Sequence, residues 1–248
     1  MIEADVVAEG RRLVELAAGR GVPLRLLGGV AVRLRATDEL PSALAREYQD
    51  IDLVTGRGRS GDVVGLLRAE GYAPHVAFNA LNGQDRLLFF DEEHDRQVDV
   101  FVGSFRMCHT IPVGDRLETD PVSVPLAELL LTKLQIAELN EKDVRDTLAL
   151  VHDHAIGEAD GEMVNGARVA ALCAGDWGLW RTITQNLDAC RSYAGTYDLS
   201  AAERVTARLD ELLERIEREP KTRGWRLRAR IGERKRWYDL PEEVAGGP

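Results

Sequence analysis

The spacing of hydrophobic residues changes character about half-way along this chain. Up to about residue 120, short apolar runs such as Leu24–Leu27 and Val98–Val102 alternate with stretches of helical spacing. After Pro125, apolar residues recur mostly at three- and four-residue spacing, and almost everything downstream is typical of helix. The pattern predicts an α/β (α+β) protein with a mixed-sheet core in residues 1–120, followed by an all-helical domain in residues 121–248.

Local signals predict individual elements. We expect helices at residues 2–18, 31–36 and 62–70, and strands at residues 24–27, 51–54, 75–78, 87–90 and 98–102. Asn82-Gly83 is expected to form a turn between two of these strands. In the second half, one long helical stretch is expected from residue 126 through 151, and a charged amphipathic helix at residues 200–218, ended by Pro220.

Composition excludes several classes of protein. The 248 residues are 44% hydrophobic, enough for a buried core, and carry a formal net charge of −10 at pH 7. An acidic body disfavours general affinity for nucleic acid. The three cysteines are too few and too widely spaced to indicate a disulfide framework or a zinc site. The start has no signal-peptide pattern and no apolar run reaches 18 residues, so we expect a soluble, cytoplasmic protein that does not contact a membrane.

Two acidic residues stand out on a predicted strand. Asp50 and Asp52 are two residues apart, so both carboxylates point to one face of the strand and the apolar Ile51 points to the other. Paired carboxylates repel each other unless a cation lies between them, and oxygen ligands are those that Mg²⁺ prefers. Asp99, between two valines on another predicted strand, would add a third oxygen ligand if the strands are neighbours.

The Gly28-Gly29 pair lies between an apolar run and a predicted helix. A turn of this kind exposes backbone N–H groups at a helix N-terminus, where they can hold a triphosphate. Three acids with two metal ions would activate an attacking hydroxyl and stabilise a leaving pyrophosphate. The pattern therefore predicts phosphoryl chemistry with Mg²⁺ or Mn²⁺ as cofactor and an NTP as substrate.

Each of these features also has a purely structural explanation. A Gly pair after a strand is often a plain turn, an Asp-x-Asp pair is often a solvated face, and a lone Asp in a strand can block aggregation at a sheet edge. Their order favours a catalytic site: a strand, Gly-Gly, a helix, a strand with Asp-x-Asp, and a later strand with a single Asp.

Four segments together resemble a known superfamily. LLGGVAVRL, REYQDIDLV, QVDVFV and LLLTKLQIAELNEKDVRDTLAL are similar to the nucleotidyltransferase superfamily of the DNA polymerase beta type. Within it, they look most like the AbiEii-type toxin and the aminoglycoside or lincosamide adenylyltransferase-like branches. The resemblance covers about residues 24–151 and implies a mixed-sheet nucleotidyltransferase core. It also implies that Gly28 and Gly29 hold phosphates, that Asp50 and Asp52 are metal ligands, and that Asp99 is a ligand and a possible base for the acceptor hydroxyl.

The resemblance extends to three further residues and has two departures. It implies that Lys133 steadies the triphosphate, that Asp146 matches the acid of the last motif, and that Arg46 takes the place of an Arg common in these branches. Tyr48, however, stands where Ser or His is common, and twenty residues separate Gly29 from Asp50, more than in minimal members. Both departures put the identity of the acceptor in doubt more than the metal chemistry.

The stretch from Lys221 to Arg236 is strongly basic and contains Trp225. It is a candidate RNA or phosphate contact, although a solvated helix face or a partner for the acidic body is at least as well supported.

Three function classes follow. The first is an enzyme that transfers an NMP, with AMP favoured, from an NTP to a hydroxyl-bearing acceptor, and a small molecule is preferred because an acidic body suits cationic substrates. The second is a toxin-like nucleotidyltransferase acting on tRNA or protein, which the basic stretch would favour. The third is a non-catalytic nucleotide-binding module with the same fold.

Overall fold

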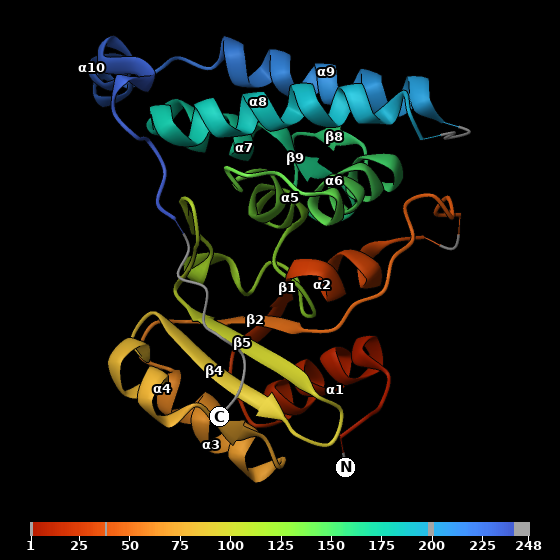
Figure 1. Ribbon diagram of the computed structural model, residues 1–248, viewed down its shortest axis with the longest axis vertical. Coiled ribbons are helices and arrows are strands. Elements are labelled where there is room, and N and C mark those ends of the chain that lie inside the picture. The colour runs from red at the N-terminus through yellow and green to blue at the C-terminus, as the bar shows by residue number, and fades with distance from the viewer. Residues whose placement is uncertain (1, 38, 198–200, 241–248) are drawn as a thin grey trace.

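A five-stranded sheet and a layer of helices make up the molecule. The computed structural model describes residues 2–37, 39–197 and 201–240. In Figure 1 the sheet and its flanking helices occupy the lower half of the view, and the helices of the second half of the chain lie above them. The predicted fold class, a mixed sheet followed by a helical region, is confirmed.

The sheet has the strand order β1-β2-β5-β4-β3, in which only β2 and β5 are parallel neighbours. The strands are β1 (Leu24–Leu27), β2 (Ile51–Thr55), β3 (Ala73–Pro74), β4 (Arg86–Asp91) and β5 (Arg96–Val102). Residues 122–124 extend the sheet beyond β1, because Leu26 exchanges backbone hydrogen bonds with Val122 and Val124. The segment at the predicted domain boundary is thus tied to the sheet.

Helices of the first half pack around this sheet, and a hairpin follows it. They are α1 (Val6–Gly19), α2 (Gly28–Arg35), α3 (Ser60–Ala69) and α4 (Val76–Asn82), and the hairpin consists of β6 (Ser104–Arg106) and β7 (Thr110–Pro112) before a short 3₁₀ turn, Gly114–Arg116. Contacts between α2 and the helices α5 and α6 join the sheet to the second half.

The second half is helical apart from one small strand pair. Its helices are α5 (Leu126–Leu134), α6 (Glu141–Asp153), α7 (Gly166–Gly175), α8 (Trp177–Ala194), α9 (Ala202–Arg218) and α10 (Arg223–Ile231), followed by a 3₁₀ turn at Gly232–Arg234. The strands β8 (Ile156–Gly157) and β9 (Val164–Asn165) pair in parallel between α6 and α7. One continuous hydrophobic core includes residues from both halves. Among the described residues, no helix combines the length and apolar character needed to cross a membrane.

Three predictions of local structure are wrong. Residues 75–78 form the start of α4 rather than a strand, because the His75 side chain caps the helix by accepting a hydrogen bond from the N–H of Phe78. Asn82 accordingly ends that helix rather than starting a hairpin turn. The long helical stretch after Pro125 is two helices, α5 and α6, and the second begins where the Asn140 side chain caps it.

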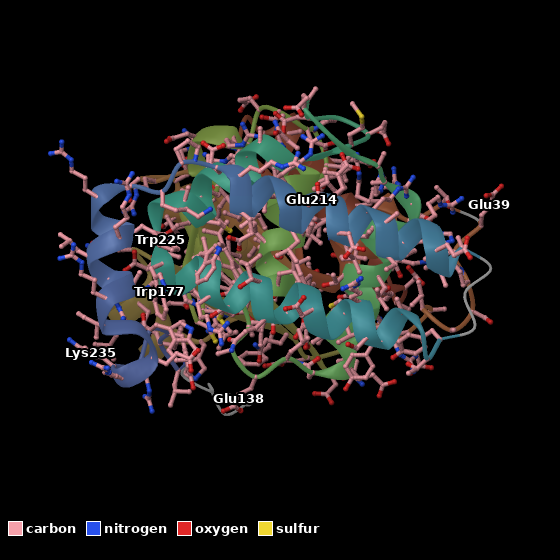
Figure 2. The ribbon with its side chains drawn as sticks, turned by 90° about the horizontal axis from the view of Figure 1, so that it is seen from above. Glu39, Glu138, Trp177, Glu214, Trp225 and Lys235 are labelled. Carbon is pink, nitrogen blue, oxygen red and sulfur yellow. The ribbon has the colours of Figure 1, made fainter. Side chains whose placement is uncertain are left out.

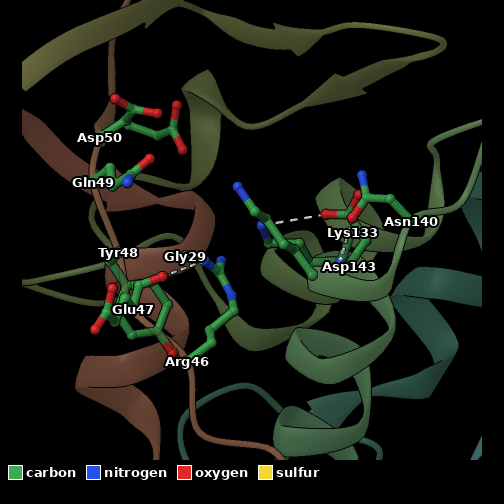
Figure 3. A pocket seen from close by; sticks show the side chains of 11 residues that line it. Gly29, Arg46, Glu47, Tyr48, Gln49, Asp50, Lys133, Asn140 and Asp143 are labelled. Carbon is green, nitrogen blue, oxygen red and sulfur yellow. Dashed lines mark hydrogen bonds and ion pairs between the residues drawn. The ribbon is translucent and has the colours of Figure 1, made fainter.

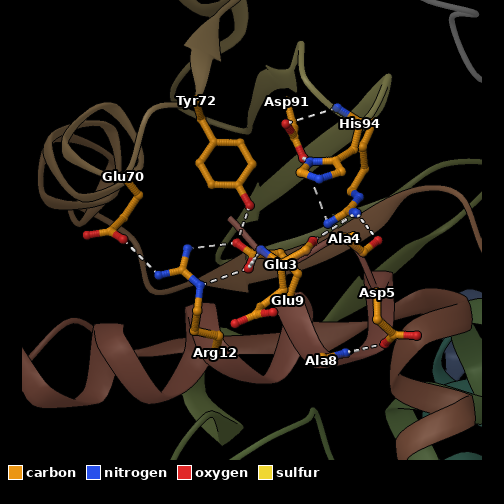
Figure 4. A network of polar contacts seen from close by, with 11 residues as sticks. Glu3, Ala4, Asp5, Ala8, Glu9, Arg12, Glu70, Tyr72, Asp91 and His94 are labelled. Carbon is orange, nitrogen blue, oxygen red and sulfur yellow. Dashed lines mark hydrogen bonds and ion pairs between the residues drawn. The ribbon is translucent and has the colours of Figure 1, made fainter. Parts of the chain in front are cut away.

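A buried carboxylate anchors α1 to the segment that connects α3 and β3 (Figure 4). Glu9 is fully buried and accepts hydrogen bonds from the Tyr72 hydroxyl, from the Arg12 guanidinium at 2.8 Å and from the Glu3 N–H at 2.9 Å. Burial alone would raise the pKa of Glu9, but the bonds from Arg12 and Tyr72 outweigh it and lower the pKa. Arg12 continues the network to Glu70 at 2.8 Å, so the network joins α1 to the end of α3.

We expect Glu9→Ala to lower the free energy of unfolding by about 3 kcal/mol, because it leaves buried donors without an acceptor. Since the folded-state pKa of Glu9 is lowered, the lost stabilisation should be present above the unfolded pKa and should fade as pH falls through the folded value. Urea denaturation at pH 7 and at acid pH measures both effects. Glu15→Ala, an exposed position on the same helix, should change stability by no more than about 0.5 kcal/mol. Equal effects of the two substitutions would contradict this account.

Candidate active site

Two of the three predicted acids face each other across the parallel strand pair β2 and β5. The register of β2 and β5 pairs Asp52 with Asp99, and neighbouring strands lie about 4.8 Å apart. Asp50 lies one residue before β2 and is exposed. The expectation that the acids come from adjacent strands is confirmed, and it follows from the strand order β1-β2-β5.

The acids crowd negative charge at a partly buried position. Burial first, and then the charges of Asp99 and Asp50, raise the pKa of Asp52 to about 7 against the opposing effect of Lys133. The pKa of Asp50 is also raised, first by burial and then by Asp99. Among the described residues, neither Asp50 nor Asp52 forms an ion pair with a Lys or Arg.

Asp99 is in a different situation, because other side chains already hold it. Arg86 on β4 donates from Nε to one carboxylate oxygen at 2.7 Å, and Gln97 donates from Nε2 to the other at 2.7 Å. Asp99 is buried, and the Arg86 guanidinium matches its charge. Neither partner was predicted from the sequence, because Arg86 follows Asp85 directly and nothing near it points to Asp99.

The donor set fits a cation at two of the three acids. Within the described ranges, no three Asp, Glu, His or Cys side chains are arranged to share one metal ion. Asp50 and Asp52 nevertheless offer carboxylate oxygens with no neutralising cation, and such oxygens are the ligands of Mg²⁺ and Mn²⁺. Asp99, as held by Arg86 and Gln97, does not complete a three-acid cluster.

The glycine pair opens α2 directly beneath Asp52. Gly28 has a φ of +68°, which a residue with a side chain rarely adopts, and a Cβ there would overlap the Asp52 carboxylate. A Cβ on Gly29 would overlap the Arg46 guanidinium and the Tyr48 ring. In the described part of the chain no side chain caps the N-terminus of α2, so the N–H groups of its first turn are left for a ligand or solvent. The predicted proximity of the glycines to the acids is therefore present.

A pocket lies in front of these residues (Figure 3). Its volume is about 160 Å³. Residues around Gly29 and the Asp50/Asp52 pair line one side, and residues of α5 and α6, with the N-cap residue Asn140 of α6, line the other. The lining residues are Gly29, Arg46, Glu47, Tyr48, Gln49, Asp50, Asp52, Lys133, Asn140, Lys142 and Asp143. A volume of this size suits a phosphate chain better than a whole nucleotide, because pockets for drug-sized ligands occupy roughly 300–1,000 Å³.

Asp146 on α6 holds two cations at the edge of this pocket. Arg46 donates two hydrogen bonds to its two oxygens, at 2.7 and 2.6 Å, and Lys133 lies 2.9 Å away. Burial alone would raise the pKa of Asp146, but Lys133 and Arg46 outweigh it and lower the pKa. Lys133 also lies 3.6 Å from Asp143, so it meets fixed anions rather than reaching solvent. Arg46 in turn stacks on the Tyr48 ring, with its guanidinium carbon 4.3 Å from the ring centroid.

The structure thus brings together all eight predicted residues, in two groups. The acids Asp50, Asp52 and Asp99 lie with the glycine pair on the sheet, and Arg46, Lys133 and Asp146 lie where α5 and α6 meet it. Asp143 was missed, although its place three residues before Asp146 on a predicted helix puts both carboxylates on one face.

Comparisons with known proteins give little further identification. No model of a known protein family matches the sequence, and no curated protein matches it. Among solved structures, the chain is similar to an antigenic nucleotidyltransferase-like protein from Paracoccidioides brasiliensis. The identity is 12% and the TM-score 0.42, over 90% of this chain and 97% of that chain. A likeness at this level assigns neither a family nor an activity to this chain.

The raised pKa of Asp52 predicts how stability varies with pH in the absence of divalent cations. Because its folded-state pKa of about 7 exceeds the unfolded value, folding should be favoured at low pH and should lose this contribution as pH rises through 7. The melting temperature in EDTA should therefore fall between pH 5.5 and 8.5, and less so in Asp52→Asn. Asp62→Asn, at an exposed acid on α3, is the control and should behave as the wild type. The same decline in Asp52→Asn as in the wild type would show that Asp52 is not the titrating group.

Proposed function

We propose that this protein is a metal-dependent nucleotidyltransferase that transfers an NMP, with AMP favoured, from an NTP to a hydroxyl-bearing acceptor. One observation carries the proposal. Asp50 and Asp52 place carboxylates that no described Lys or Arg pairs with at a pocket that Gly29, in the first turn of α2, also lines. Negative charge that lacks a cation, next to N–H groups that lack an anion, suits a metal–triphosphate complex.

Asp50 and Asp52 would hold the metal ion. When bound, Mg²⁺ or Mn²⁺ supplies the positive charge that orients the phosphates and stabilises the charge developing on the leaving pyrophosphate. The raised pKa of Asp52 means that the cation must displace a proton near neutral pH. Metal binding should therefore strengthen as pH rises through about 7.

The cationic side of the pocket would bind the phosphate chain. Lys133 and Arg46 both line it, and Asp146 keeps their charged groups in place without lining the pocket itself. Asp146 is thus a positioning residue in this proposal. The N–H groups of Gly28 and Gly29 would add hydrogen bonds to the same phosphates.

Asp99 would accept the proton of the acceptor hydroxyl. Arg86 and Gln97 each occupy one lone pair of its carboxylate, which leaves a second lone pair on each oxygen. The Arg86 contact also supports a competing function, a nucleotide-binding module without catalysis, because an acid neutralised by an arginine is a weaker base and a weaker metal ligand. Nucleotide transfer by the purified protein separates the two functions.

We expect Asp50→Asn and Asp52→Asn each to abolish NMP transfer and to weaken metal-dependent NTP binding, with the fold retained. The measurements are transfer of label from each of the four α-labelled NTPs with Mg²⁺ or Mn²⁺, and NTP titration with and without EDTA. Lysate protein, total RNA and small hydroxylated antibiotics serve as acceptors. Asp62→Asn should retain activity. Activity that survives in EDTA or in either site variant would contradict the mechanism, whereas metal-dependent NTP binding without transfer to any acceptor would favour the non-catalytic module.

Lys133→Ala should raise the dissociation constant for the metal–NTP complex about tenfold or more, as expected for loss of a charge-assisted contact of roughly 1.5–3 kcal/mol. Lys142→Ala is a matched control, because Lys142 lines the same pocket but is exposed and should contribute little. Calorimetric titration with a non-hydrolysable NTP measures both. Since Lys133→Ala removes a partner of buried Asp146, its unfolding curve is needed alongside. A folded Lys133→Ala variant with unchanged affinity would remove Lys133 from the site.

A further inference from the structure

A second, larger pocket lies on the Arg86 side of Asp99. It has a volume of about 440 Å³, within the range of about 300–1,000 Å³ that ligand sites occupy. Its lining combines aromatic, apolar, amide and charged groups: Phe78, Asn82, Asp85, Arg86, Phe101, Arg106, Met107, Asp239 and Leu240. Arg86 connects this pocket to the acids, because its Nε donates to Asp99 while its guanidinium faces the rings of Phe78 and Phe101, at 5.8 and 5.3 Å from the ring centroids.

The chemistry of this pocket suits a nucleoside better than a phosphate. Two arginines are balanced by two aspartates in the lining, so the pocket has no excess of positive charge. Aromatic rings with a guanidinium near them are, however, groups on which bases stack. Asn82, Asp85 and Asp239 offer polar groups for the edge of a base or for a sugar.

The end of the described chain links this pocket to the basic helix α10. Residues 235–240 return from α10 to the β6–β7 hairpin, where the Asp239 N–H donates to the Cys108 carbonyl at 3.0 Å and its carboxylate lies 3.7 Å from Arg106. We call this segment the strap. A third pocket, of about 420 Å³, lies between the strap, the hairpin and α10, and Asp239 lines both it and the second pocket.

Positive charge without carboxylate partners is concentrated on α10 and the strap. Between Lys221 and Arg236 there are eight Lys or Arg residues and one acidic residue, Glu233, in a chain of net charge −10. In the part of the chain that the structure describes, Glu233 pairs with Arg181, and no carboxylate pairs with Arg223, Arg230, Arg234, Lys235 or Arg236. Figure 2 shows nitrogen-tipped side chains projecting outward from α10 beside Trp225 and Lys235.

Tryptophans fix α10 and the strap in place. Trp180 packs against Trp225 of α10 at 5.1 Å, and Trp177 packs against Trp237 of the strap at 6.0 Å between ring centroids. These are the four tryptophans of the chain. The basic surface is therefore held on the helical body, and tryptophan emission reports on it but not on the pocket at Asp50 and Asp52.

We propose that the acceptor is the end of a single-stranded nucleic acid. Its phosphates would follow α10 and the strap, and its terminal nucleoside would stack in the pocket beside Arg86. The inference rests on the proposed function and specifies its acceptor. The terminal hydroxyl oxygen attacks the α-phosphorus of the NTP, its proton passes to Asp99, and the bond between the α- and β-phosphates breaks to release pyrophosphate. A neutral pocket at the reacting end, continued by a cationic surface, fits such a polymer better than a small cationic acceptor.

The first test measures binding alone, in EDTA and without NTP, so that it does not depend on transfer. Fluorescently labelled 12-nucleotide RNA and DNA of one sequence are titrated by anisotropy at several salt concentrations, with tryptophan emission as a second signal. A triple variant of the basic surface should bind at least tenfold more weakly at low salt; its substitutions are Arg230→Gln, Arg234→Gln and Lys235→Gln. It should also flatten the salt dependence by up to about two units of slope, because each phosphate contact on a single strand contributes about 0.7. A control triple variant changes the charge equally at exposed arginines of the first half and should bind as the wild type does; its substitutions are Arg11→Gln, Arg57→Gln and Arg68→Gln.

The second test addresses the pocket. Phe78→Ala should weaken binding of the strand about fivefold or more, as expected for loss of one stacked base, while Val76→Ala at an exposed position of the same helix should not. Equal affinity of the two triple variants, or absence of RNA and DNA binding by the wild type, overturns the inference even if the enzyme transfers NMP to another acceptor. Strand binding of the predicted pattern, without metal-dependent NTP binding, would instead overturn the proposed function and leave the strand site intact.

Discussion

The parallel register of β2 and β5 is the constraint on which the site depends. It sets Asp52 opposite Asp99 on one face of the sheet, and Asp50 lies just before β2, toward solvent. Burial, followed by the like charge of Asp99, raises the pKa of Asp52 to about 7. The fold relieves only part of this repulsion, because Arg86 neutralises Asp99 and leaves the other two acids without a cation.

The positive charge at the pocket depends on the contact between the two halves of the chain. The sheet supplies the acids and the glycine pair, whereas α5 and α6 supply Lys133 and Asp146. Asp146 draws Lys133 and Arg46 together at the edge of the pocket, where a phosphate chain would need positive charge. Burial of these ions is tolerable because each has a partner at 2.6–2.9 Å. Separation of the two halves would therefore disassemble the cationic side of the site and leave the acidic side on the sheet.

Local sequence signals were sufficient to predict the strands that carry Asp52 and Asp99. They were insufficient where contacts between residues far apart in the sequence determine the structure. The apolar run Leu24–Leu27 and the alternation around Asp52 both predicted strands, and both form strands, although Asp50 precedes β2 by one residue. Residues 75–78 were predicted as a strand because their composition suits one, but the His75 cap makes them helical. The Arg86 contact with Asp99 joins residues on neighbouring antiparallel strands, and no pattern within either strand specifies that pairing. The same holds for the return of the strap to the hairpin, since it depends on tertiary packing of tryptophans.

Diffraction from crystals grown with Mn²⁺ and a non-hydrolysable NTP tests the central claim most directly, because anomalous scattering locates manganese independently of any assumed mechanism. The account predicts a manganese peak about 2.1 Å from carboxylate oxygens of both Asp50 and Asp52. It also predicts phosphate oxygens against the N–H groups of Gly28 and Gly29 and near Lys133. A manganese ion bound elsewhere, or a nucleotide bound away from the glycine pair, would contradict it.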